Sequence, residues 1–98
     1  MFCGMSLTAA RTGRKGDLVA AALDHAAALR RQPGCSATYV LEESEGSGVV
    51  AMSIFESEDA FQRAVAATRS VIGKHHLEEL VEGVGEFRTF RVRDAPPT

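Results

Sequence analysis

The sequence contains no tryptophan and no asparagine, and only two of its 98 residues are cysteines. Cys3 and Cys35 lack the Cys-x-x-Cys spacing of metal and redox sites, and no other ligand pattern is visible, so we expect no bound metal. No run approaches the roughly 18 apolar residues of a membrane-spanning helix. The net charge of −2 provides no basic field, which argues against nucleic acid or an anionic membrane as a partner.

No basic region precedes the first apolar residues, so the N-terminus does not have the pattern of a secretory signal. Together with cysteines that we expect to be reduced, this predicts a cytoplasmic protein. The hydrophobic fraction of 45 % is ordinary for a globular chain of this length, which corresponds to one domain. We place that domain at residues 1–93 and expect residues 94–98, which include two adjacent prolines, to form a disordered tail.

The most informative stretch joins an apolar strand to a helix. In residues 49–55 both alternating sets of side chains are apolar or small, which is typical of a strand covered on both faces. Ser57 is placed to cap a helix whose first turn is acidic. An inward stripe at helical spacing follows: Phe61, Val65, Thr68 and Ile72. Gly73 should end this helix before a second short helical turn.

The remaining elements are strands at 2–8, 35–43 and 86–93 and an alanine-rich helix from Asp17 to Arg31. The resulting order, β-α-β-β-α-β, predicts the α+β, ferredoxin-like fold, an antiparallel sheet with both helices on one face. The first strand should lie between the third and fourth, with the second beyond the third. Cys3 and Cys35 would then be about 9–10 Å apart, beyond the roughly 7 Å that a disulfide tolerates.

Three sequence features resemble the antibiotic biosynthesis monooxygenase (ABM) family. They are Pro33-Gly34-Cys35 before a strand, the strand-to-helix junction at 55–61, and a histidine before a short helix. The resemblance covers about residues 7–92. It implies a dimeric α/β barrel, in which the sheet packs against a partner's sheet. It also implies a cofactor-independent oxygenase for a small aromatic or quinol-like molecule, with no metal or flavin.

A homodimer also follows from the residues themselves. Both faces of the strand at 49–55 are apolar, yet two short helices can cover only one face of the sheet. A second copy of the chain would cover the other face.

The candidate site is the break between the two C-terminal helical segments. We predict a pocket there, between the sheet and the helices, with His75 or His76 as general base because imidazole titrates near neutral pH. The sequence does not decide which of the two faces the pocket. We expect the substrate to contact four other residues: Tyr39, Met52, Phe55 and Ile72. His25, on the apolar stripe of the first helix, is interpreted as a partly buried histidine with its hydrogen bonds satisfied.

Three classes of function remain open from the sequence. The first is the oxygenase; the second is a dimer that binds a small hydrophobic ligand without turnover; the third is a haem-binding or haem-degrading protein with a histidine ligand. The studied oxygenases and haem degraders of this fold use tryptophan and asparagine, which this chain lacks. That absence favours the binding dimer somewhat and ranks haem last.

Overall fold

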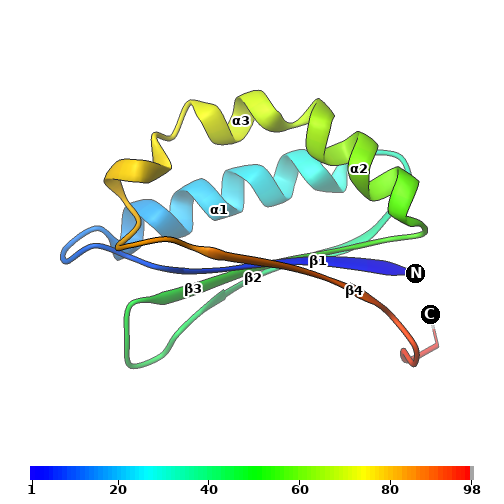
Figure 1. Cartoon of the computed structure of the whole chain (residues 1–98), viewed down its shortest axis with the longest axis horizontal. Coiled ribbons are helices and arrows are strands. Elements are labelled where there is room, and N and C mark those ends of the chain that lie inside the picture. The colour runs from blue at the N-terminus through cyan, green and yellow to red at the C-terminus, as the bar shows by residue number, and fades with distance from the viewer. Residues whose placement is uncertain (98) are drawn as a thin grey trace.

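The computed structural model describes residues 1–97, and it places the helices on one side of a four-stranded sheet (Figure 1). The elements, in chain order, are β1 (Phe2–Ala9), α1 (Lys15–Arg30), β2 (Cys35–Glu42), β3 (Gly48–Phe55), α2 (Glu58–Ala67), α3 (Arg69–Gly73), the 3-10 helix η1 (Leu77–Glu79) and β4 (Glu86–Arg91). No helix within residues 1–97 is long and apolar enough to cross a membrane.

The sheet has the strand order β2-β3-β1-β4, and every neighbouring pair is antiparallel. This confirms the predicted α+β, ferredoxin-like class and its strand order. β3 separates β1 from β2, and Cys3 and Cys35, which lie on those two strands, are free thiols.

The core lies between the sheet and the helices. Phe55, which is fully buried, and Phe61 of α2 meet with ring centroids 5.8 Å apart, and Phe61 also packs on Phe2 at 5.3 Å. A Cβ atom at Gly4 of β1 would overlap the Phe61 ring. Only glycine therefore lets α2 approach the sheet this closely.

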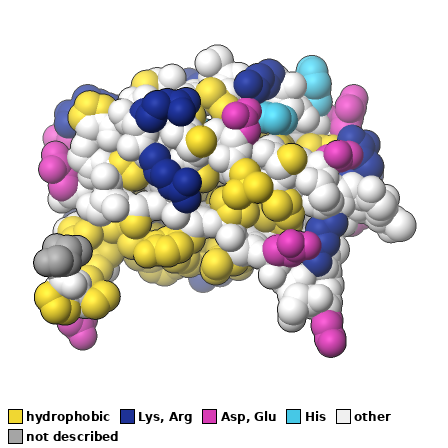
Figure 2. Space-filling view, turned by 180° about the vertical axis from the view of Figure 1, so that it is seen from behind, with side chains coloured by type: hydrophobic (Ala, Val, Ile, Leu, Met, Phe, Trp, Pro, Cys, Tyr) yellow, Lys and Arg dark blue, Asp and Glu magenta, His cyan; other side chains and the backbone are white. Residues whose placement is uncertain are grey.

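The opposite face of the sheet carries no helix. Side chains that alternate onto it include Val50, Met52 and Ile54 of β3, and Tyr39 and Leu41 of β2 pair with Met52 and Val50. Tyr39 and Leu41 are about half exposed. Hydrophobic side chains gather along this lower side of the molecule (Figure 2).

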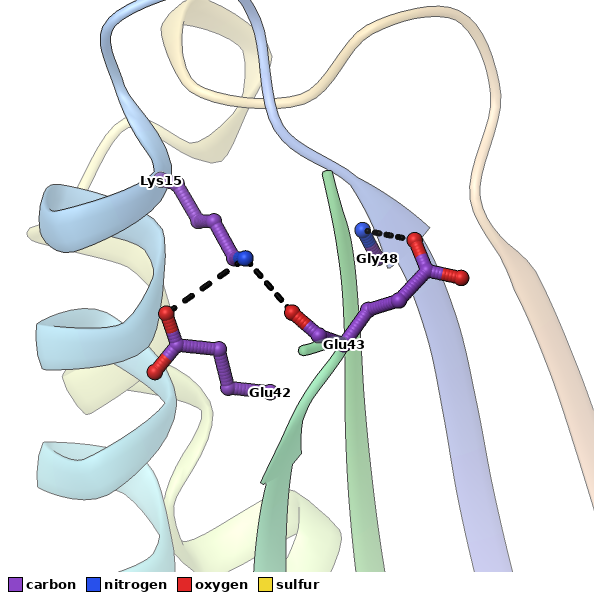
Figure 3. Close-up of polar contacts among 4 residues, drawn as sticks. All are labelled: Lys15, Glu42, Glu43 and Gly48. Carbon is purple, nitrogen blue, oxygen red and sulfur yellow. Dashed lines mark hydrogen bonds and ion pairs between the residues drawn. The ribbon is translucent and has the colours of Figure 1, made fainter. Parts of the chain in front are cut away.

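The first helix begins two residues earlier than predicted, because Asp17 does not cap it. Asp17 lies in the first turn of α1 and pairs with Arg14 at 2.8 Å. Lys15 instead ties this end of the helix to the β2–β3 hairpin: its Nζ donates to the Glu43 carbonyl at 2.6 Å and lies 3.5 Å from the Glu42 carboxylate (Figure 3).

The second helix breaks earlier than predicted. The sequence placed the break at Gly73, but α2 ends at Ala67 and α3 follows it from Arg69 to Gly73. Thr68, between them, has φ −106° and ψ 8°, and its hydroxyl donates to the Ala64 carbonyl at 2.8 Å. Hydroxyl bonds to the carbonyl four residues back bend helices, which explains the earlier break.

The last strand ends at Arg91 rather than at residue 93. Residues 94–97 are exposed and lack regular secondary structure. Thr98, the end of the predicted tail, lies outside the described residues.

Ser57 caps α2 as predicted, since its side chain accepts a hydrogen bond from the Ala60 amide at 3.1 Å. We expect Ser57→Ala to destabilise the protein by about 1 kcal/mol, which lowers Tm by about 4–8 °C in a domain of this size. Ser70→Ala, at an exposed serine of α3, is the control and should leave Tm unchanged. Equal melting temperatures for the two variants would show that the cap contributes nothing.

Candidate functional site

A cavity of about 250 Å³ lies between the sheet and the helices. Its floor comes from β1 and β3, and its walls come from α1, α2, α3, η1 and β4. Most of the wall is apolar: Ala22, Leu29, Phe61, Val65, Ile72, Leu77 and Phe87. The predicted space between the sheet and the segment 72–77 is therefore present, and both ends of that segment line it.

The polar groups of the cavity are few. Hydroxyls come from Ser6, Thr8 and Ser53, and among the described lining residues His25 of α1 is the one titratable side chain on the helix side of the sheet. No Asp, Glu, Lys or Arg is among the described residues that line the cavity. An apolar space with a few convergent polar groups is the usual form of a small-ligand site.

His25 is half-buried, and its Nε2 lies 3.0 Å from the Thr68 hydroxyl oxygen. Burial disfavours the charged imidazolium and lowers the pKa of His25, while the nearby Asp24 carboxylate has the smaller, opposite effect. The imidazole is therefore neutral at pH 7. A neutral imidazole beside an apolar cavity has the protonation state that a general base requires.

The structure brings three of the four predicted contact residues to the cavity: Tyr39, Met52 and Ile72. Tyr39 and Met52 form a cross-strand pair whose side chains alternate to the sheet face away from the helices, so they border the cavity through the strand backbone. Phe55 is fully buried in the neighbouring aromatic core and is not part of the lining.

The predicted histidine pair lies between α3 and η1, where His75 is partly buried and His76 is exposed. His75 Nε2 is 2.8 Å from the Asp24 carboxylate, which Lys74 also contacts at 3.1 Å. The hydrogen bond from His75 lowers the pKa of Asp24 most, and the hydrogen bond from Lys74 lowers it further. The side chain of His76 is exposed, and its backbone is in the left-handed conformation, with φ 50°. Neither histidine of the pair lines the cavity.

A shallower groove of about 560 Å³ lies at the end of the sheet near the β2–β3 hairpin. Its rim carries four carboxylates: Glu42, Glu43, Glu82 and Glu86. We place the site in the smaller cavity because that cavity is more enclosed and holds a neutral base. Among residues 1–97, no three His, Cys, Asp or Glu side chains come together as a metal site would require.

The comparisons with known proteins agree with this architecture. The family model described as antibiotic biosynthesis monooxygenase matches residues 1–71. The chain belongs to the antibiotic biosynthesis monooxygenase family. The predicted family is thereby confirmed, and the matched region includes β1, β3 and both main helices, which form most of the cavity. No curated protein sequence matches the chain.

Solved structures from several organisms share this fold. A Mycobacterium tuberculosis protein superposes with a TM-score of 0.84 at 14% identity, covering 98% of each chain. SnoaB of Streptomyces nogalater, described as a cofactor-independent oxygenase, has a TM-score of 0.74 at 20% identity over 99% of this chain and 97% of its own. A Shewanella oneidensis protein has a TM-score of 0.79 at 22% identity, over 91% of this chain and 87% of its own.

Proposed function

We propose that this ABM-family protein is a cofactor-independent monooxygenase that oxidises a small, neutral aromatic or quinol-like molecule in the cavity beneath α1. Family membership supports the reaction class. The observation that carries the proposal is His25, a neutral imidazole at an uncharged apolar cavity. The structural relative SnoaB is described as an oxygenase of this type.

The lining of the cavity supports the choice of substrate class. A carboxylate or phosphate would have to leave water for a wall that has no Lys or Arg to pair with it, and burying an unpaired charge is costly. A neutral ring with one weakly acidic hydroxyl fits better. Its ring would contact the aliphatic wall, and its hydroxyl would reach His25 or the hydroxyls of Ser6 and Ser53.

The proposed reaction needs no external reductant. His25 removes a proton from the substrate, and the resulting anion is electron-rich enough to reduce O₂. When a hydroxyarene reacts through its keto tautomer, a ring CH₂ becomes C=O: one oxygen atom enters the product and the other leaves as water with both hydrogens. All four electrons that reduce O₂ come from the substrate. The apolar wall excludes water, which strengthens the electrostatic interactions of the anion.

His75 and His76 remain the alternative source of the base. The 2.8 Å bond from His75 to Asp24 would orient its imidazole, as carboxylates do in His–Asp pairs. For the pair to act on a ligand in the cavity, α3 and η1 would have to move. His25 already lines the cavity, and this favours it as the base.

We propose further that the protein acts as a homodimer through the uncovered face of the sheet. The apolar side chains of β2 and β3 on this face, among them Leu41 and Val50, support such an interface. A standard interface buries about 1,600 Å² in total, and this face is the largest surface of the sheet that no helix covers.

Oxygen uptake with a panel of aromatic compounds tests the proposed function. We expect consumption of O₂ with neutral hydroxyarenes that fit about 250 Å³ and whose keto tautomer has a ring CH₂, and at least tenfold slower consumption with analogues that differ only by an added carboxylate. Binding of the neutral compounds without O₂ consumption would instead identify a ligand-binding dimer. A Soret band on titration with haem, at one haem per chain, would favour the third class.

The pH dependence of oxygen uptake should follow the base. Because the pKa of His25 is lowered by burial, its neutral form persists at pH 7, so we expect a rate that is flat above neutral pH and falls only as the pH drops through this lowered pKa. Unfolded histidine titrates at about 6.5, so the unfolded chain binds the proton first and stability also declines below that pH. A rate that is already falling from pH 8 to pH 7 would contradict His25 as the base.

A further inference from the structure

The hydroxyl of Thr68, the residue that follows α2, contacts two groups at once: the carbonyl of Ala64 and the ring of His25. Thr68 is 2% exposed. Its Oγ1 lies 2.8 Å from the Ala64 carbonyl and 3.0 Å from Nε2 of His25. A hydroxyl has one hydrogen to donate and two lone pairs to accept with. A carbonyl only accepts, so the Ala64 contact is a hydrogen bond only if Thr68 donates its single hydrogen there.

The remaining contact then fixes the proton on His25. With its hydrogen directed at Ala64, Thr68 accepts from His25, which requires a proton on Nε2 and leaves the lone pair of the neutral ring on Nδ1. The opposite tautomer would place a hydrogen on Nδ1, which has no hydrogen-bond partner among residues 1–97. Nδ1 is also not enclosed, since the one buried side-chain N or O atom without a partner in that range is Thr38 Oγ1.

We infer that Thr68 is a positioning residue that holds His25 as the Nε2–H tautomer and leaves the Nδ1 lone pair free to accept a proton from a ligand in the cavity. The catalytic part of this inference rests on the proposed function. The tautomer itself does not, because it follows from the two distances alone.

The backbone at Thr68 supports the same reading. Its φ of −106° and ψ of 8° lie in the bridge region between the helical and extended basins, where active-site residues are often found. The kink separates α2 from α3 and places the hydroxyl against His25 of α1 rather than against its own helix alone.

The test combines two substitutions at Thr68 with the tautomer and the rate. Thr68→Val keeps the branched shape and removes the hydroxyl, and Thr68→Ser keeps the hydroxyl. Long-range ¹H–¹⁵N correlation spectra of the full chain, with His25 assigned by its loss in His25→Gln, report which ring nitrogen carries the proton. We expect the Nε2–H pattern in the wild type and T68S, and a mixture of both neutral tautomers in T68V.

Activity provides the second readout. Losing the orientation of a catalytic group costs about 10- to 100-fold, so kcat of T68V should fall by that factor with KM changed less than about twofold, and T68S should recover it. An Nδ1–H tautomer in the wild type would overturn the inference, even if T68V does not fold. So would a T68V protein with wild-type tautomer and kcat. If the spectra show the expected tautomers but no compound causes oxygen uptake, the proposed function is wrong and the tautomer assignment still holds.

Discussion

Replacing His25 by glutamine should lower kcat for oxygen uptake by about 10²- to 10⁴-fold, the usual contribution of a general base. Glutamine keeps an N–H group that can donate to the Thr68 hydroxyl, so the contact at 3.0 Å has a substitute. It has no basic nitrogen, so proton removal from the substrate is lost. Steady-state oxygen-electrode measurements on the wild type and the variant give the ratio directly.

The matched comparison is the double variant His75→Ala/His76→Ala. These side chains lie outside the cavity, and we expect this double variant to lose less than about tenfold in kcat. Circular dichroism should show that both proteins are folded. If the double variant loses activity and His25→Gln does not, the histidine pair predicted from the sequence is the base and His25 is a structural residue.

Replacing Leu41 by arginine should convert the proposed dimer to a monomer. Leu41 lies on the uncovered sheet face opposite Val50 and is 49% exposed in the single chain, so the arginine should not disturb the fold. In a dimer built on this face, the guanidinium would have to leave water for an interface formed largely by apolar side chains. An uncompensated buried charge costs about 3–5 kcal/mol, so the dimer should weaken by at least about 100-fold. Sedimentation velocity across micromolar concentrations measures the change.

Leu23→Arg is the control for this substitution. Leu23 is a leucine of α1 with 54% exposure, close to that of Leu41, but it does not lie on the sheet. We expect it to remain dimeric. A monomeric wild type, or equal dissociation of the two variants, would contradict an interface on the sheet.

The order of the elements follows closely from the sequence because the apolar periods and the turn residues are local signals. The period-2 pattern at 49–55, the serine cap at Ser57 and the strong order β-α-β-β-α-β are sufficient to predict the sheet and its strand order. The start of α1 was misplaced because Asp17 looks like a cap, while in the structure it pairs with Arg14 inside the first turn. The backbone angles of the residues around Asp17 decide whether it caps the helix or lies in its first turn, and the sequence does not give those angles.

The site was only partly predictable. The space beneath the segment 72–77 was predicted from the sequence. His75 and His76 stay predicted as the base, while the histidine that lines the cavity is His25. A usable signal was present: His25 and Thr68 are polar residues on the apolar stripes of two helices that cover the same face. Polar residues on facing apolar stripes are expected to pair, because buried polar groups need hydrogen-bond partners. Which histidine reaches the cavity depends on how the helices pack, and spacing along the chain does not encode that.

Turnover under ¹⁸O₂ by chelator-treated protein, with the best substrate of the panel, tests the proposed oxygenase directly. We expect one ¹⁸O atom in each product molecule, one O₂ consumed per product, and a rate that does not depend on residual metal. His25→Gln, measured beside it, should form product about 10²- to 10⁴-fold more slowly. Product without ¹⁸O, or a rate that scales with added metal and is unchanged in His25→Gln, would contradict a cofactor-independent oxygenase with His25 as its base.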